Sequence, residues 1–443
     1  MNVQANKASK SEQKIGIYPY YVVGVLTLIT MMNFVDRSLI AILSPAIKED
    51  LGLADWQLGA LKGIAFAVLY ALLAIPIAQF ADRTSRIGVV GAAVTGWSIF
   101  TMLCGFAQNF THLLFARIGM SIGEAGGTAP AHALLSDYFP KEKRGTALSI
   151  INLGVPLGVA FAFLGGGWLV TTFDWRTAFI VMSTPGIVFG VLALFTIREP
   201  ERGRLDSGSS DSFAGSDKSP IRVFLGAMRH LFAIPSFCCF TVAMTFAAMG
   251  SYSIGAWIVD FFARAHASTP PMSLFFWLGM AALFGQVAGV FLGGFLVDKL
   301  SVRNRAYYGI LPGLATLILV PLYLWSLWTN NVGLALGLQF PVGAFAGVFI
   351  GPSFAIVQTL APVSIRALAA AIFLMVFNLF GMGVGPTAVG VVSSLLDSSF
   401  GSDIALRIAI SIAVLCYLLA SMFFLLASRY LNNDWAKATE NGA

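Results

Sequence analysis

The sequence predicts an all-α, polytopic membrane protein with twelve transmembrane helices in two pseudo-symmetric six-helix bundles. Of its 443 residues 57% are hydrophobic and only 11% are charged, and the mean hydropathy is +0.81. Long apolar stretches fill most of the chain, its basic residues gather in alternate connections, and landmarks of one half recur in the other. This composition excludes an ordinary soluble protein, and the short polar segments leave no room for a separate soluble catalytic domain.

The apolar stretches define twelve spans, at about 20 to 25 residues for each crossing. The first span, about 18–43, is too long for the apolar core of a signal peptide and should remain in the mature chain. The other predicted spans are 55–81, 88–108, 111–139, 145–170, 175–197, 236–263, 272–297, 306–328, 333–361, 365–396 and 404–430.

The positions of the basic residues predict the orientation. With a cytoplasmic N-terminus, 20 of the 27 Lys and Arg residues fall on the cytoplasmic side and two lie within spans. This excess follows the positive-inside rule, so we predict an inner-membrane protein with both termini in the cytoplasm. The net charge of +6 therefore requires no nucleic-acid partner. The five basic residues assigned to the outside are Lys48, Lys62, Arg176, Arg264 and Arg407.

A polar segment rich in Ser, Gly and Asp divides the chain after the sixth span, and this composition is typical of a flexible linker. Apolar residues at helical spacing over 221–232 then predict either an amphipathic helix on the membrane surface or an early start of the seventh span. The predicted parts are a cytoplasmic tail (1–17), a six-helix bundle (18–198), a cytoplasmic linker (199–234), a second six-helix bundle (235–430) and a cytoplasmic tail (431–443).

An internal repeat supports this division into halves. At the repeat offset of about 216, Tyr252 corresponds to Asp36. Secondary transporters built from such repeats place their binding site at the repeat interface and alternate access to it. The matched landmarks are Pro130, Pro140, Arg144 and Ala147 with Pro352, Pro362, Arg366 and Ala369, each 222 positions later, and Asp82 and Arg83 with Asp298 and Lys299, each 216 positions later.

Few ionisable side chains lie inside the predicted spans. Each costs about 2.5 to 3.5 kcal/mol at the centre of a spanning helix, so such residues are functional candidates. We find nothing comparable in the second half, where the candidates for the central site are polar and uncharged. The candidates are Asn33, Asp36 and Arg37 in the first span, Arg117, Glu124 and Thr128 in the fourth, and Tyr252, Gln286, Ser353 and Asn378 in the second half.

Helical geometry separates the faces of these two spans. At about 100° per residue, Glu124 lies within roughly 20° of Arg117, whereas Arg37 points roughly 100° away from Asp36. Asp36 and Arg37 therefore need different partners, and a contact between Asp36 and Arg117 is geometrically plausible. The small residues Gly119, Gly123 and Gly127 lie on another face of the fourth span, which we assign to helix packing.

We interpret Asp36 and Glu124 as a titratable pair with Arg117 as a counter-ion that changes partner when a carboxylate is protonated. The alternative is a permanent structural ion pair between two helices. Other charges, at the cytoplasmic helix ends, are candidate gating residues because an acid followed by bases can hold neighbouring helix ends together. These are Asp82, Arg83, Arg86 and Asp298, and the alternative for them is ordinary positive-inside anchoring.

Several segments resemble known transporters. The motif "AQFADRTSR" is similar to the inner-loop signature of the major facilitator superfamily, although Ala78 stands where glycine is usual. The segments "NFVDRSLIA", "ARIGMSIGEAGGTAPAHALL" and "FDWRTAFIVMSTPG" together resemble the Spinster subfamily, including its structurally studied bacterial member. The resemblance covers the whole chain. It implies that Asp36, Arg37, Arg117 and Glu124 are the functional residues of the first and fourth spans.

The resemblance implies a proton-coupled transporter of lipid-like or drug-like molecules, of the sphingosine-1-phosphate or lysophospholipid type. An amphipathic anion suits the sequence, since Arg37 and Arg117 can receive its head and abundant Phe and Met residues can line its tail. We expect a monomer among membrane lipids, with protons as the coupling ion and no cofactor. The alternatives are a receptor or lipid sensor without transport, and a transporter of small organic anions. No sequence motif of a membrane enzyme or of a channel filter is present.

Overall fold

The computed structural model describes residues 16–200, 220–362 and 365–440, and these ranges form helices joined by short connections. Among them, eleven helices are long and apolar enough to cross a membrane. The remaining predicted crossing, the fourth, consists of two shorter helices, α5 and α6, on either side of a turn at residues 125–127. Both pack against α3 and α4. Twelve crossings therefore account for the described chain, as the sequence predicts.

The first half contains six crossings, of which the second, fourth and fifth are interrupted. Its helices are α1 (Ile17–Leu51), α2 (Asp55–Lys62), α3 (Ile64–Arg83), α4 (Arg86–Cys104), α5 (Phe110–Glu124), α6 (Thr128–Tyr138), α7 (Lys141–Asn152), α8 (Gly154–Phe161), the π-helical turn η1 (Ala162–Gly166), α9 (Gly167–Thr172) and α10 (Trp175–Thr196).

The second half repeats this arrangement after a connecting helix. Its elements are α11 (Pro220–Phe232), α12 (Pro235–Ala265), α13 (Pro271–Met280), η3 (Ala281–Gly285), α14 (Gln286–Ser301), α15 (Tyr307–Trp328), α16 (Val332–Gly337), α17 (Gln339–Val348), α18 (Ile350–Leu360), α19 (Arg366–Phe377), η5 (Asn378–Val384), α20 (Gly385–Phe400) and α21 (Ser402–Glu440).

The connecting helix α11 is separate from the seventh crossing, because α11 ends at Phe232 and α12 begins at Pro235. The last helix also extends beyond the predicted boundary at residue 430. Its Asp434 accepts hydrogen bonds from the backbone nitrogen (3.0 Å) and the hydroxyl (2.6 Å) of Ser236 in the first turn of α12. A carboxylate stabilises the start of a helix in this way, which gives the end of α21 a packing role.

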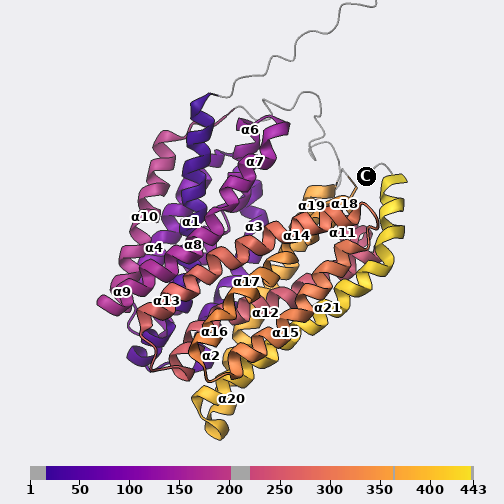
Figure 1. Cartoon of the computed structure of the whole chain (residues 1–443). Coiled ribbons are helices and arrows are strands. Elements are labelled where there is room, and N and C mark those ends of the chain that lie inside the picture. Colours follow the sequence, from indigo (N-terminus) through magenta and orange to yellow (C-terminus); the bar gives the residue numbers. More distant parts are fainter. Residues whose placement is uncertain (1–15, 201–219, 363–364, 441–443) are drawn as a thin grey trace, which may run out of the picture.

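The two halves approach each other at one end of the molecule and diverge at the other (Figure 1). We call the end with Gly16, Arg198 and Pro220 the linker end and the end with Gly52 and Gly401 the far end. In the part of the chain that the structure describes, the hydrogen bonds that join the halves lie toward the far end, mainly between α2 and α20 and between α2 and α12. The halves are therefore closed at the far end.

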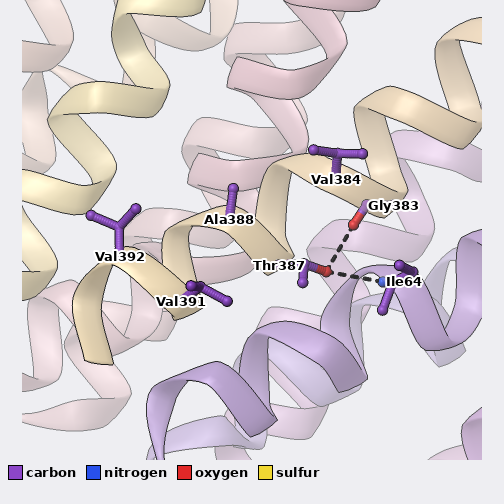
Figure 2. Close-up of a pocket in the computed structure, with 7 residues that line it drawn as sticks. All are labelled: Ile64, Gly383, Val384, Thr387, Ala388, Val391 and Val392. Carbon is purple, nitrogen blue, oxygen red and sulfur yellow. Dashed lines mark hydrogen bonds between the residues drawn. The ribbon is translucent and has the colours of Figure 1, made fainter. Parts of the chain in front are cut away.

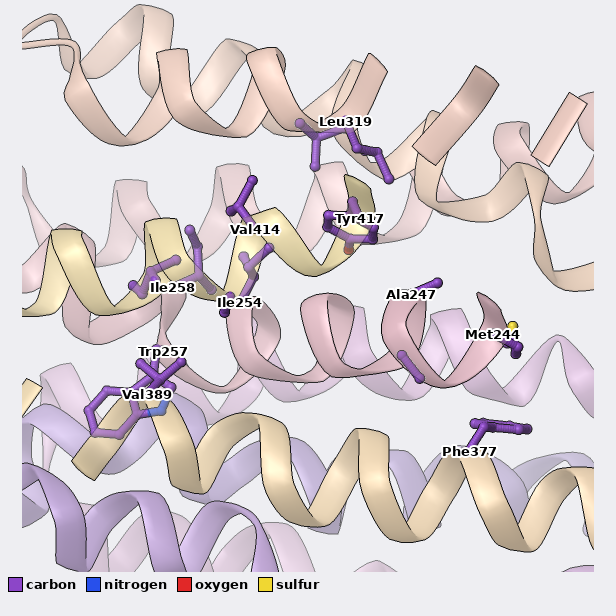
Figure 3. Close-up of a cluster of buried hydrophobic side chains, with 14 of the residues drawn as sticks. Met244, Ala247, Ile254, Trp257, Ile258, Leu319, Phe377, Val389, Val414 and Tyr417 are labelled. Carbon is purple, nitrogen blue, oxygen red and sulfur yellow. The ribbon is translucent and has the colours of Figure 1, made fainter. Parts of the chain in front are cut away.

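A hydrophobic core fills the second half around α12. Figure 3 shows its side chains, from Met244 near one end of α12 to Trp257 and Ile258 near the other, against Val389 of α20 and Tyr417 of α21. Trp257 and Tyr417 are fully buried. This core fixes the orientation of α12, and with it the side chains that α12 presents to the first half.

Glycine allows close backbone contact between α14 and α17. A Cβ added to Gly289 would lie 1.9 Å from the backbone oxygen of Ala344, and such overpacking costs about 1 to 3 kcal/mol. We therefore expect Gly289→Ala to lower the melting temperature of the purified protein by about 3 °C or more. The matched control is Gly294→Ala on the same helix, where nothing lies within 4 Å of the added Cβ; an equal loss in both variants would contradict this explanation.

Candidate functional site

A buried ion pair joins the first and fourth crossings. Arg37 of α1 donates through Nε to Oε2 of Glu124, the last residue of α5. The Glu124 side chain is fully buried, whereas 15% of the Arg37 side chain remains accessible. The other Glu124 oxygen, Oε1, has no donor among the described residues. The sequence predicts Arg117 as the counter-ion of this site, but the structure places Arg37 on Glu124.

Arg117 lies beside this pair without a carboxylate partner among the described residues. Its Nε donates to the carbonyl oxygen of Leu61 at 3.2 Å, and its Nη1 lies 3.0 Å from the sulfur of Met120. The ring of Phe66 is shared by two cations, since its centroid is 5.2 Å from Cζ of Arg117 and 5.0 Å from Cζ of Arg37. The electron-rich ring face stabilises both guanidinium groups.

Asp36 is buried and has no cationic partner among the described residues. Its Oδ2 accepts a long hydrogen bond of 3.4 Å from the hydroxyl of Ser98 in α4, and the side chain of Trp97 lies near enough to interact with the carboxylate. The contact with Arg117 that the sequence made plausible is not an ion pair in this structure. Burying a carboxylate that has no ion-pair partner is costly, so Asp36 is unlike the paired Glu124.

The second half adds polar groups near Arg37. Tyr252 of α12 donates to Oδ1 of Asn378 at 3.3 Å and lies near enough to Arg37 to interact with it electrostatically. Tyr70 of α3 places its ring centroid 4.8 Å from Cζ of Arg37. Tyr252, predicted from the sequence, therefore lies near Arg37 at the interface of the halves, and Asn378, also predicted, contacts Tyr252.

The other predicted ligands are more dispersed. Asn33 is buried one turn before Arg37 on α1, and its side chain lies near enough to Glu124 to interact with that carboxylate. Thr128 is exposed at the start of α6. The hydroxyl of Ser353 is buried and donates to the carbonyl of Phe349 in its own helix. Gln286 lies at the start of α14, beside the backbone of Gly347 in α17. The structure does not bring Ser353 or Gln286 into contact with the charged residues.

The predicted gating residues lie at the linker end, each within its own half. Arg86 binds Asp82 at 3.0 Å and also pairs with Asp137 at the end of α6. Asp298, in the other half, accepts a 3.4 Å hydrogen bond from Tyr308, and Arg83 is exposed. The described contacts of Arg86 and Asp298 stay within their own halves.

Sequence reasoning missed two buried charges toward the far end. Lys62, which the sequence analysis assigned to the outside, is buried in α2 and lies 2.6 Å from Oδ2 of Asp260 in α12. The prediction that the second half holds no comparable charge is therefore wrong, because Asp260 is buried there. The available signals were that Lys62 lies within the predicted second span and Asp260 within the seventh.

A second network closes the far end nearer its surface. Asp55, at the start of α2, accepts from both terminal nitrogens of Arg264, at 2.7 and 2.8 Å. It also accepts from Lys48 and from Ser393, each at 2.6 Å. A carboxylate that is held bidentately by an arginine and by two further donors forms a strong contact, so Asp55 ties α2 to α12 and α20.

An apolar cavity of about 310 Å³ lies where α3 meets α20, and Figure 2 shows the residues around it. Thr387 donates to the carbonyl of Gly383 and accepts from the backbone nitrogen of Ile64. The other lining residues are apolar, and none of the seven is ionisable. The cavity is therefore separate from the charged cluster, and we assign it no part in the site.

Comparison with known proteins gives a consistent result. The model of the Major Facilitator Superfamily matches residues 26–386. An "MFS-type efflux pump" of Mycolicibacterium smegmatis is 30% identical and the alignment covers 93% of each chain. The probable galactarate/D-glucarate transporter GudP of Escherichia coli is 26% identical, with 93% of this chain and 95% of the relative covered.

A solved structure is also similar over nearly the whole length. A bacterial homologue of the human lysosomal transporter Spinster, crystallised in an inward-facing and occupied conformation, superposes with a TM-score of 0.82 at 28% identity. The alignment covers 95% of this chain and 98% of that chain. At this identity the present chain is a relative of that protein and not the same protein.

Proposed function

The chain belongs to the major facilitator superfamily, so it is a secondary transporter and not an enzyme, and we propose that it moves an amphipathic anion together with protons. The resemblance to the superfamily that the sequence indicates is thereby confirmed. The Spinster-like substrate, of the lysophospholipid or sphingosine-1-phosphate type, belongs to the proposal. The similarity to an efflux pump and to a bacterial Spinster homologue supports a transporter, and the lipid-like or drug-like cargo is what the resemblance to the Spinster subfamily implies.

The observation that carries the proposal is the separation of Arg117 from Asp36. Among the described residues, Arg117 has no carboxylate within ion-pair distance and Asp36 has no cation within that distance. With Asp36 protonated, the cluster of Asp36, Arg37, Arg117 and Glu124 carries one positive charge and attracts an anion. With Asp36 ionised, the cluster is neutral and the attraction is lost. Proton binding and anion binding therefore favour each other, which is the requirement for coupling.

The geometry supports alternating access. We propose that the linker end faces the cytoplasm, following the positive-inside rule, with the chain in the inner membrane and both termini cytoplasmic. The structure then corresponds to an inward-facing state, because the halves are joined at the far end. The predicted gating residues Asp82, Arg83, Arg86 and Asp298 are proposed to form contacts between the halves when the linker end closes. We further propose that the transporter works as a monomer.

A second candidate cargo is a small organic anion. The similarity to the probable galactarate/D-glucarate transporter favours it, since a dicarboxylate also binds two guanidinium groups. Such a cargo needs no apolar tail, so an uptake assay distinguishes the two classes.

The test is transport by the purified protein in liposomes, with and without an imposed pH gradient. The probes are a fluorescent lysophosphatidic acid, its zwitterionic lysophosphatidylcholine counterpart and radiolabelled D-glucarate, each compared with protein-free liposomes. We expect the gradient to increase net movement of lysophosphatidic acid about threefold or more and a protonophore to remove this increase. Movement of D-glucarate alone would favour the second candidate. Binding without net movement of any probe would favour a receptor and contradict the proposal.

A further inference from the structure

Lys62 and Asp260 form a more deeply buried ion pair between the halves than Asp55 and Arg264. Each side chain is 1% exposed, compared with 4% for Asp55 and 13% for Arg264. The Lys62 ammonium also lies 3.8 Å from the ring centroid of Trp257. Ser44 donates to the same Asp260 oxygen as Lys62, whereas Asp260 Oδ1 has no donor among the described residues.

The partners of Lys62 come from the opposite half. Lys62 belongs to α2, whereas Asp260 and Trp257 belong to α12, a helix that the core in Figure 3 holds firmly in the second half. Opening the far end separates α2 from α12, so Lys62 loses both partners in one step. In its own half, Asp55 lies nearly two helical turns earlier and is held by Lys48. The opened state therefore leaves the ammonium without the carboxylate that it contacts in the closed state.

Two further cations, Arg117 of α5 and Arg37 of α1, contact α2 and α3 near Lys62. Arg117 donates to the carbonyl oxygen of Leu61, the residue before Lys62, and packs on Phe66 one turn further on. Arg37 packs on the same ring and on Tyr70. These contacts place Arg117 and Arg37 beside the same stretch of α2 and α3 that carries Lys62.

We propose that Lys62 binds the anionic group of the substrate when the far end is open, and that Asp260 takes the substrate's place on Lys62 when that end closes. This inference rests on the proposed function, since it assumes an anionic cargo. The carboxylate of Asp260 and the phosphate or carboxylate group of the substrate compete for the ammonium of Lys62. Closure of the far end therefore requires the substrate to leave Lys62 for Arg117 and Arg37, so the anion moves inward before the path behind it closes.

The test measures binding of fluorescent lysophosphatidic acid to the purified full-length protein by thermophoresis. Asp260→Asn removes the carboxylate that competes with the substrate and should tighten binding about tenfold. Lys62→Gln removes the ammonium that binds the substrate's anionic group and should weaken binding about tenfold. The double variant should bind as weakly as Lys62→Gln, and it leaves no buried unpaired charge, so it serves if the single lysine variant does not fold. Arg176→Gln, which removes an exposed cation that pairs with Asp50 within the first half, should change binding less than about twofold.

A role in closure alone predicts a different result. Asp260→Asn and Lys62→Gln both break the same pair, so they would then shift lysophosphatidic acid binding in the same direction, and this outcome overturns the inference. An uncharged monoacylglycerol with the same fluorophore should respond alike to both variants. If wild-type protein binds lysophosphatidic acid and Arg37→Gln abolishes binding, the anionic cargo of the proposed function stands whatever the Lys62 result. If wild-type protein does not bind it, both the function and the inference fail.

Discussion

Replacement of Asp36 by asparagine is expected to abolish proton-driven transport while the protein remains folded. Asn has nearly the same shape, and the hydroxyl of Ser98 can still donate to its carbonyl oxygen. The substitution fixes this site in a neutral form, so proton binding no longer changes the charge of the cluster. We expect accumulation driven by a pH gradient to fall about tenfold or more, to the level of protein-free liposomes.

Three measurements separate coupling from damage to the fold. The melting temperature of Asp36→Asn should equal that of the wild type or exceed it, since a poorly compensated carboxylate is removed from the interior. Exchange of substrate at equal pH on both sides should continue. Asp50→Asn is the matched control on the same helix, because Asp50 is exposed and pairs with Arg176. Wild-type pH dependence in Asp36→Asn would remove Asp36 from the coupling role.

Replacement of Arg37 by glutamine is expected to abolish transport and to destabilise the protein. It removes the cationic partner of Glu124, whose side chain is fully buried. Breaking a buried ion pair from one side costs about 3 to 5 kcal/mol, and protonation of the remaining carboxylate reduces this cost. We therefore expect a lower melting temperature at neutral pH and partial recovery at acidic pH, where Glu124 can take up a proton.

The double variant Arg37→Gln with Glu124→Gln distinguishes stability from function. It removes both members of the pair and leaves neither charge unpaired, so the melting temperature should return to near the wild-type value, while transport of the anionic probe should remain absent. Arg176→Gln, which breaks the exposed pair with Asp50, is the control and should change the melting temperature little. Full transport in the double variant would show that the pair is structural, the alternative that the sequence left open.

Much of the fold could be predicted from the sequence because its signals are local. Apolar length and the positions of basic residues predict the crossings, and each crossing in the structure corresponds to a predicted span. The packing face of the fourth crossing is also confirmed, since a Cβ on Gly123 or Gly127 would collide with Trp97 of α4. Helical periodicity sufficed for this prediction because it depends on one helix alone.

Partner choice could not be predicted in the same way. The sequence showed that Asp36 and Arg37 point in different directions, and the structure agrees, with Asp36 near Ser98 and Arg37 on Glu124. It did not show that Arg37, and not Arg117, reaches Glu124. That outcome depends on the relative depth and rotation of α1, which packs mainly against α8 and α10, and of α5, which packs against α3 and α4.

Lys62 shows most clearly that the partner of a buried charge could not be predicted from the sequence. A lysine near the end of an apolar span is expected to extend toward water, and the sequence analysis placed it outside. It stays buried because α12, about 200 residues away, supplies Asp260 and the face of Trp257. The sequence by itself determined the membrane class, the crossings and the ionisable residues available. Only the tertiary structure decided which of these charges meet, because pairing depends on contacts between helices that are distant in the chain.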